Sequence, residues 1–197
     1  LVLAERQIAS IAKPFIYAAA LEDGFESCDY FNNSIITYEA YDGWQPENYD
    51  HSSDEDMKVA MWYALSRSLN LPTVDLYFET GHDKVADFCR RLGIQAPFEE
   101  TPAIALGALD ASLYDLVKAY SAFANGGLLP EKLVMIEKIT DAKGNVIYEN
   151  EDLQKTRVMT TGIAEQITAM LEKAIDEGTG ISIRNRYHIQ SELAGKT

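Results

Sequence analysis

Ser10 and Lys13 are the residues best placed to do chemistry, because three positions separate them at the start of an apolar, alanine-rich run. The run from Phe15 to Leu21, with Gly24 as a stop signal, predicts a buried helix whose first turn holds both side chains on one face. A neighbouring base activates a serine hydroxyl, and a lysine held neutral can be that base. Such pairs also occur by chance, so the interpretation needs support from the rest of the chain.

Pro14 conflicts with an ordinary helix start at this pair. A helix begun at Ser10 would lose one early hydrogen bond at Pro14, and the proline disfavours helical geometry at Lys13. Local conflicts of this kind often mark functional sites. We therefore expect the backbone around Lys13 to depart from a regular helix.

The composition suits a single domain with a sizeable core: 197 residues, of which 47% are hydrophobic and 24% charged. The net charge of −14 argues against nucleic-acid binding and gives no reason to expect adsorption to an anionic membrane. No apolar run reaches the roughly 18 residues that span a bilayer, and no signal peptide is visible. The chain does not begin with Met and stops abruptly at Thr197, so we expect it to be a piece of a longer protein.

The sequence offers no candidate metal or cofactor site. Cys28 and Cys89 are far apart and outside any ligand-like cluster, which favours buried free thiols, with a single disulfide as the alternative. His51, His82 and His188 have no other histidine or cysteine three or four positions away, so structural or surface roles are favoured for each. We therefore expect no cofactor.

Periodicity and stop signals predict a mainly α-helical domain with a small β component. The predicted helices run from a capping box at Ser53 through Met57 to about Asn70, where Pro72 is the stop, then over Val74–Thr80, Asp83–Leu92, Ser112–Phe123 and Gly162–Glu177. Residues 133–149 predict a β-hairpin, Ile35–Tyr38 a short strand, and residues 181–195 a strand-like lead into Lys196. The aromatic stretch Cys28–Tyr49 either lines a binding cleft or packs on the domain surface.

Two further polar clusters join the first one. Ser68-Leu69-Asn70 lies at a predicted helix end, and Lys196-Thr197 follows the apolar lead at the end of the chain. With Ser-x-x-Lys, these clusters resemble the three ordered signatures Ser-x-x-Lys, Ser-x-Asn and Lys-Thr-Gly of the penicillin-binding, serine-acylating enzymes. A simpler reading of Ser68 and Asn70, that they only terminate a helix, stays open on the spacing alone.

The sequence around these signatures is similar to that of the class A, bifunctional penicillin-binding proteins. The similar segments span nearly the whole chain: Lys13-Pro-Phe-Ile-Tyr-Ala-Ala-Ala-Leu21, Gly43-Trp-Gln-Pro-Glu-Asn-Tyr49, Ala64-Leu-Ser-Arg-Ser-Leu-Asn-Leu-Pro72, Phe123-Ala-Asn-Gly-Gly127 and Glu177-Gly-Thr-Gly180. Three departures stand beside them. Ile8-Ala9 replaces the family's Pro-Gly, the glycine of Lys-Thr-Gly is absent, and the flanking sheet strands at both chain ends are missing.

The resemblance implies a transpeptidase-like fold of the β-lactamase and penicillin-binding type, incomplete here. It implies one partial domain over residues 1–197, with helical regions at 1–130 and 156–180, the hairpin at 133–149 and the lead-in at 181–197. The implied activity is D,D-transpeptidation of peptidoglycan stem peptides ending in D-alanyl-D-alanine. The implied relatives act outside the bacterial cytoplasmic membrane, joined to a glycosyltransferase domain and a membrane anchor.

The resemblance also implies a role for each site residue. Ser10 attacks the penultimate carbonyl with Lys13 as base, and Ser68 relays a proton to the leaving amine through a hydrogen-bond chain with Lys13. Asn70 holds the substrate amide and Trp44 lines the substrate site. Lys196 keeps Lys13 neutral and attracts the substrate carboxylate, and Thr197 binds that carboxylate. β-Lactams would acylate the same serine.

Two alternatives share this scaffold: a β-lactamase or β-lactam sensor, and a degenerate domain that only scaffolds cell-wall partners.

The resemblance implies an oxyanion hole made by the Ser10 N–H and a second N–H beyond Thr197. Since losing one such donor slows catalysis about 100- to 1000-fold, we expect the isolated chain to be weak or inactive.

Overall fold

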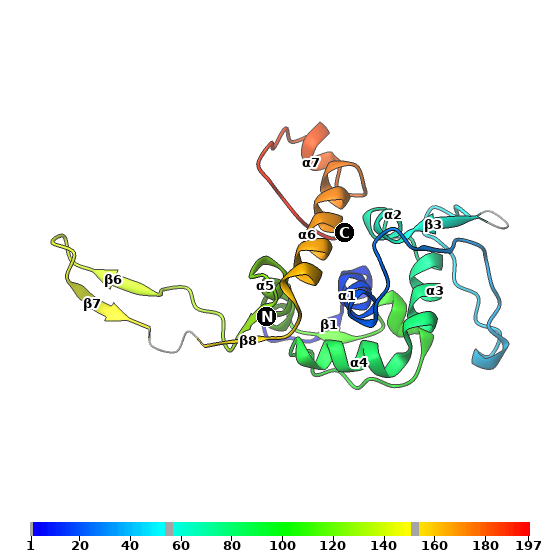
Figure 1. Cartoon of the computed structure of the whole chain (residues 1–197), viewed down its shortest axis with the longest axis horizontal. Coiled ribbons are helices and arrows are strands. Elements are labelled where there is room, and N and C mark those ends of the chain that lie inside the picture. Colours follow the sequence, from blue (N-terminus) through cyan, green and yellow to red (C-terminus); the bar gives the residue numbers. More distant parts are fainter. Residues whose placement is uncertain (1, 54–56, 151–153) are drawn as a thin grey trace.

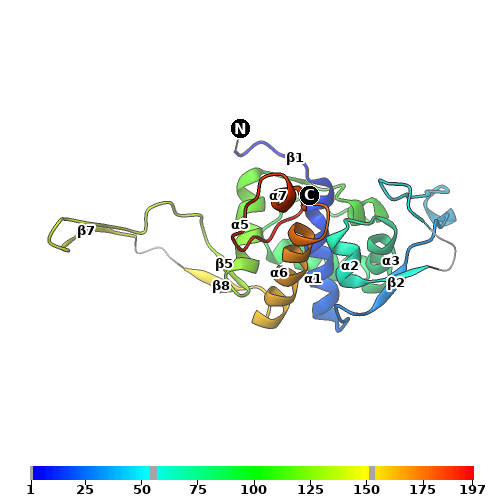
Figure 2. The same cartoon turned by 90° about the horizontal axis from the view of Figure 1, so that it is seen from above.

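The computed structural model describes residues 2–53, 57–150 and 154–197, and helices are the main regular elements of that part. The central element is α1 (Lys13–Asp23), which lies between α6 (Thr161–Asp176) and the pair α2 (Met61–Ser66) and α3 (Leu71–Thr80), with α4 (His82–Arg91) also packed on it (Figures 1 and 2). Its first nine residues are all buried. The alanines at its centre allow this close packing from several sides because they have the smallest side chains that still favour helix.

The remaining helices complete the body around this core. They are α5 (Leu113–Ala124), the short α7 (Ser182–Asn185), and the 3₁₀ helices η1 (Ala9–Ala12), η2 (Glu39–Tyr41) and η3 (Pro102–Leu106). Aromatic contacts join α5 to α1, since the Phe15 ring packs on Tyr120 and Phe123 at centroid distances of 5.5 and 6.2 Å. Among the described residues, no helix combines the length and apolarity needed to cross a bilayer.

In the described part of the chain, the strands form four antiparallel pairs. They are β1 (Arg6–Gln7) with β4 (Asp110–Ala111), β2 (Tyr30–Asn32) with β3 (Lys58–Ala60), β5 (Leu128–Pro130) with β8 (Lys155–Arg157), and β6 (Lys138–Thr140) with β7 (Val146–Glu149). The β6–β7 hairpin extends away from the helical body (Figure 1). In its register Ile139 faces Tyr148, and Asp141 organises the turn by accepting the Lys143 and Asn145 N–H groups.

Most predicted elements are confirmed. The helix after Lys13, the helices over Val74–Thr80 and Asp83–Leu92, and the hairpin lie where the patterns placed them, within a few residues. The Ser112 hydroxyl caps α5 by accepting the Asp115 N–H, as its capping-box form predicts. The helix predicted over Gly162–Glu177 is α6.

The helix predicted from Ser53 to Asn70 is wrong at both ends. Lys58–Ala60 form β3 because they pair with β2, and the helix begins only at Met61. Residues 54–56 of the proposed capping box lie outside the described part. The helix ends at Ser66, and Pro72 lies in the first turn of α3, where its missing N–H has no helical partner to lose.

Two predicted strands are absent from the described residues. Ile35–Tyr38 forms no strand, because Tyr38 makes only a single bridge to Trp44. Residues 181–195 hold α7 and irregular chain, so the strand-like lead into Lys196 is wrong. Both cysteines are free: Cys28 is exposed and Cys89 is buried. The disulfide alternative is therefore excluded, and the expected burial holds for Cys89 alone.

Candidate active site

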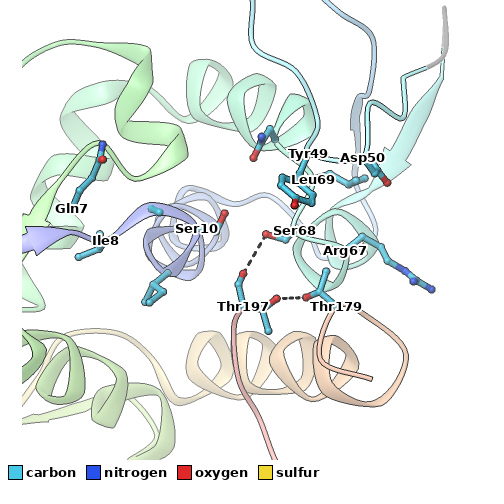
Figure 3. A pocket seen from close by; sticks show the side chains of 13 residues that line it. Gln7, Ile8, Ser10, Tyr49, Asp50, Arg67, Ser68, Leu69, Thr179 and Thr197 are labelled. Carbon is cyan, nitrogen blue, oxygen red and sulfur yellow. Dashed lines mark hydrogen bonds between the residues drawn. The ribbon is translucent and has the colours of Figure 1, made fainter. Parts of the chain in front are cut away.

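The segment that carries Ser10 is the 3₁₀ helix η1, held from both sides by main-chain contacts. The Ile8 N–H donates to Leu109 O at 2.9 Å and the Ala9 N–H donates to Gly107 O at 3.1 Å. On the other side the Tyr120 hydroxyl donates to Ile11 O at 2.8 Å. Ser10 thus lies on a rigid support at the N-terminal end of α1, with its side chain at a cavity wall (Figure 3).

Lys13 does not depart from helical geometry as the proline led us to expect. Its φ and ψ are −52° and −45°, and it is the first residue of α1. The conflict is resolved because the chain changes from 3₁₀ to α-helix at Lys13. Pro14 then occupies a first-turn position, where no intrahelical bond to its nitrogen is required.

The Lys13 side chain is completely buried, and its ammonium group donates to three oxygens. The Nζ atom lies 2.7 Å from Ser68 O, 3.1 Å from Leu69 O and 2.7 Å from Asn70 Oδ1. Burial, and after it the positive charge of Lys196, lower the pKa of Lys13 from 10.5 to about 7. A large fraction of this amine is therefore neutral near neutral pH.

The turn between α2 and α3 forms the second corner of the site. Ser68 adopts φ of +57°, a left-handed conformation that a serine rarely takes, in the turn that presents the carbonyls of Ser68 and Leu69 to Lys13. The Thr73 hydroxyl also donates to Leu69 O, at 2.7 Å, and pairs with the buried Tyr17 hydroxyl at 3.0 Å. One of the Lys13 acceptors, the Leu69 carbonyl, is thus itself held by buried hydrogen bonds.

The end of the chain forms the third corner. The Lys196 Nζ donates to Ser68 Oγ at 2.6 Å and to the backbone oxygen of Thr197. Burial lowers the pKa of Lys196 to about 8, so this amine keeps its proton to a higher pH than Lys13 does. The Thr197 and Thr179 hydroxyls are hydrogen-bonded, as Figure 3 shows.

A glycine places Thr179 next to the second corner. The Thr179 N–H donates to Ser66 O at 3.2 Å, and a Cβ on Gly178 would lie 2.1 Å from that same oxygen. The segment after α6 can therefore reach the C-terminal end of α2 only with glycine at position 178.

These three corners surround one cavity of about 710 Å³. Its walls carry Gln7, Ile8, Ala9, Ser10, Ile11, Tyr49, Asp50, Arg67, Ser68, Leu69, Asn70, Thr179 and Thr197 (Figure 3). Lys13 and Lys196 bond to Ser68 and lie beside this wall. The structure thus brings together six of the seven predicted site residues, from segments up to 187 positions apart in the sequence.

A family model described as the penicillin binding protein transpeptidase domain matches residues 4–197. The chain belongs to this family. The resemblance to class A penicillin-binding proteins is confirmed as well, since the curated relatives include proteins of the 1A and 1B types. The transpeptidase-domain fold, mainly helical with few strands, is confirmed with it.

Individual relatives agree with this assignment. Penicillin-binding protein 1B of Haemophilus influenzae is 34% identical over 99% of the chain, and penicillin-binding protein 1A of Rickettsia prowazekii is 32% identical over 98% of it. The crystal structure of penicillin-binding protein 1A from Haemophilus influenzae superposes with a TM-score of 0.81 at 27% identity, covering 98% of this chain and 34% of that one. The chain spans about a quarter of the length of these curated relatives, 25% and 27% respectively.

Two details of the predicted transpeptidase site need correction. Trp44 does not line the cavity, because it packs against Tyr38 at a centroid distance of 5.7 Å and that ring stacks on Phe78. The predicted chain from Lys13 to the Ser68 hydroxyl is also absent. Lys13 bonds the backbone oxygen of Ser68, and the hydroxyl bonds Lys196 instead.

Sequence reasoning missed three contributors to the site: Asn48, Thr179 and the Tyr17–Thr73 pair. Thr179 lies in a segment singled out only as a family landmark, and its contact with Thr197 depends on the fold. Asn48 is 2% exposed, and three of its four side-chain partners lie 15 to 23 positions away, so spacing alone carried no signal for it. The useful signal was an asparagine within a stretch rich in aromatic residues, where a buried amide must find partners.

Proposed function

We propose that the chain is the acyl-transfer portion of a D,D-transpeptidase in which Ser10 is the nucleophile. Its hydroxyl oxygen attacks the penultimate carbonyl of a stem peptide ending in D-alanyl-D-alanine. A Ser10 ester forms, the amide C–N bond breaks, and the terminal D-alanine leaves as an amine. The observation that carries the proposal is the convergence of three polar clusters on one cavity beside a buried lysine whose pKa is about 7.

Lys13 is the proposed base. The ammonium form can satisfy all three oxygens that surround Nζ, whereas the neutral amine has two N–H groups for them. The neutral form therefore keeps a lone pair for the proton of Ser10.

The proton taken from Ser10 must then reach the leaving amine. The Ser68 hydroxyl, held by Lys196, lies between the clusters and is the proposed relay.

Lys196, Thr197 and Asn70 are the proposed substrate-binding groups. Lys196 remains charged at a pH where Lys13 is neutral, so it can attract the terminal carboxylate of the peptide while keeping Lys13 deprotonated. Thr197 presents its hydroxyl to the cavity wall to bind that carboxylate. Asn70 also lines the cavity, although its amide is held by Lys13 and by Glu47 O.

In the second half-reaction an amine of a neighbouring stem peptide attacks the ester and releases Ser10, forming the cross-link. Attack by water gives carboxypeptidase activity instead. For the whole protein we propose one transpeptidase domain containing residues 1–197, joined to a glycosyltransferase domain and a membrane anchor, and acting on peptidoglycan outside the cytoplasmic membrane. The support is that the relatives are penicillin-binding proteins about four times as long.

The test is covalent labelling of the full-length protein by a fluorescent penicillin. Ser10→Ala should abolish labelling, because no other residue would form the ester. The matched control is Ser121→Ala, whose hydroxyl bonds within α5 to Lys118 O and does not line the cavity; it should label like the native protein. Labelling that persists in Ser10→Ala would refute the assignment. A native protein that never labels would favour the scaffold alternative.

The lifetime of the adduct separates synthase from lactamase. Asp50 is the one carboxylate among the described residues of the cavity wall, and it bonds the Ser52 N–H and hydroxyl. Within the described part of the wall, no carboxylate is therefore free to activate water against the ester. We expect intact-protein mass spectrometry to find an acyl-enzyme that lasts minutes or longer, whereas decay within milliseconds would support the lactamase alternative.

A further inference from the structure

Asn48 lies in the loop between η2 and β3 and makes four hydrogen bonds while being almost completely buried. Its Oδ1 accepts the Asn70 N–H at 2.7 Å and the Leu71 N–H at 3.1 Å. Its Nδ2 donates to Asn33 Oδ1 at 2.8 Å and to Ser52 O at 2.5 Å. Only an NH₂ group can donate to the Ser52 carbonyl, so the orientation of the amide is fixed by its partners.

The side chain of Asn70 makes its hydrogen bonds outside its own helix. Asn70 is the N-cap residue of α3, a position where asparagine usually turns its side chain back onto the N–H groups of the first turn. Here it makes no such cap. Instead its Oδ1 accepts Lys13 Nζ at 2.7 Å and its Nδ2 donates to Glu47 O at 2.7 Å. N–H groups at the start of α3 are satisfied by Asn48 from another segment.

We propose that Asn48 is a positioning residue that anchors the N-terminal end of α3 and thereby aims the Asn70 amide at the active site. Without the Asn48 oxygen, the Asn70 and Leu71 N–H groups lose their acceptor, so the start of α3 would shift and carry the Asn70 amide away from Lys13. The inference rests on the proposed function, since it concerns the reactivity of Ser10 and Lys13.

The neighbouring Glu47 also holds the Asn70 side chain in place. Its backbone oxygen holds the Asn70 amide from the side opposite Lys13, so one short loop fixes both the backbone and the side chain of Asn70. Displacement of a reacting or binding group by about 1 Å can slow a reaction about 100-fold. We therefore expect Asn48→Ala to lower the second-order rate of acylation by a fluorescent penicillin by up to about 100-fold.

A double-mutant cycle in the full-length protein tests whether Asn48 acts through Asn70. The variants are Asn48→Ala, Asn70→Ala and the double variant, each measured for penicillin acylation and for thermal unfolding. If Asn48 acts through Asn70, the double variant acylates about as fast as Asn70→Ala alone. If the two losses multiply, Asn48 acts by another route and the proposal is overturned.

Thr160→Ala is the matched control, because the Thr160 hydroxyl caps the N-terminal end of α6 by accepting the Ile163 N–H at 3.3 Å and does not line the cavity. It should lose stability without slowing acylation.

The pH profile gives a second readout. Loss of the Asn70 oxygen removes an acceptor that favours the Lys13 ammonium, so Asn48→Ala should move the midpoint of acylation to lower pH, with Lys196 unchanged beside it. An Asn48→Ala variant with the rate and midpoint of Thr160→Ala would overturn the proposal.

If Asn48→Ala does not fold, Asn33→Ala replaces it in the same cycle, since it removes the side-chain oxygen that accepts from the Asn48 amide and leaves Asn48 itself in place. It should slow acylation less, and should have no effect when Asn70 is already alanine. An additive effect there counts against the proposal. Absence of acylation in the native protein would refute the proposed function instead, so the two failures are distinguishable.

Discussion

Replacing Lys196 by methionine tests how the site keeps Lys13 neutral. The pKa of Lys13 is lowered by burial first and by the Lys196 charge second. Lys196→Met keeps a long side chain but removes the charge, so burial alone then acts on Lys13. The substitution should therefore raise the pKa of Lys13 and move the onset of acylation to higher pH.

The size of the effect follows from the two pKa values. With a pKa of about 7, half of the Lys13 amines are neutral at pH 7, whereas an ordinary lysine with the value 10.5 would be neutral in about one molecule in 3,000. The environment thus enriches the reactive form roughly 1,500-fold. A like charge removed from close range is worth about one pH unit or more, which would reduce the neutral fraction at pH 7 to about one tenth.

The assay is stopped-flow acylation of the full-length protein by a chromogenic β-lactam between pH 5.5 and 9.5. The native rate should rise through pH 7 as Lys13 loses its proton, and fall above about 8 as Lys196 loses its own. Lys196→Met should have its rising limb about one unit higher and lack the falling limb. Normalising each profile to its maximum removes the part of the loss that comes from weaker carboxylate binding.

The control is Lys84→Met, which removes an exposed lysine paired with Asp23, away from the cavity. Its profile should match the native one. An unchanged midpoint in Lys196→Met would refute the reasoning, because the Lys196 charge would then have no part in setting the protonation of Lys13. A rate that keeps rising tenfold per pH unit to pH 9.5 in the native protein would refute the lowered pKa itself.

Three further predictions concern stability, measured by chemical or thermal unfolding. Ala9 has φ of +46°, and Ala9→Gly should stabilise the fold by about 0.5–1 kcal/mol, or roughly 2 °C, because glycine takes this conformation without strain. Protonating buried Lys13 opposes folding, so native stability should rise between pH 7 and 10 by about 1.4 kcal/mol per unit from this group, and Lys13→Met should flatten that slope. Gly178→Ala should unfold the segment after α6 and slow acylation, because its Cβ would lie 2.1 Å from Ser66 O.

The sign of the Lys13 effect follows from proton uptake. Between the folded pKa of about 7 and the unfolded value of 10.5, the unfolded chain binds the proton and the native chain does not. Raising the pH across that window therefore stabilises the native state, and below it the penalty is fully present. A stability curve equally steep in Lys13→Met would show that other groups cause the slope.

Local patterns predicted the elements that local interactions determine. The alanine-rich run, the Ser112 cap and the period of α6 each carry their signal within one helix. The failures came where a distant partner decides the structure. Lys58–Ala60 became a strand because β2 lies beside it, and residues 181–195 did not become one because no described strand pairs with them.

The site shows the same division. Ser10 and Lys13 could be predicted together because one helix start positions both. The hydrogen-bond partners of Lys13 could not, since they depend on the left-handed turn at Ser68, to which the sequence gives no glycine signal. Sequence reasoning therefore named the chemical groups of the site. It assigned the Ser68 hydroxyl to Lys13, however, whereas that hydroxyl bonds Lys196 and Lys13 bonds the Ser68 backbone oxygen.

Three unfavourable features of this domain lie in or beside the cavity wall. Ala9 and Ser68 hold positive φ angles, and Lys13 is buried with a depressed pKa. Each costs stability by itself, and each persists because the packed core around α1 and the hydrogen bonds of Asn48, Thr73 and Tyr120 leave the backbone no relaxed alternative. Since the same strain sets the protonation of Lys13 and the aim of its three acceptors, relieving it at Lys13 should stabilise the fold while abolishing acylation. Ala9 has no polar side chain, and its N–H bonds Gly107 O. Relieving the backbone strain at Ala9 should therefore leave acylation largely intact.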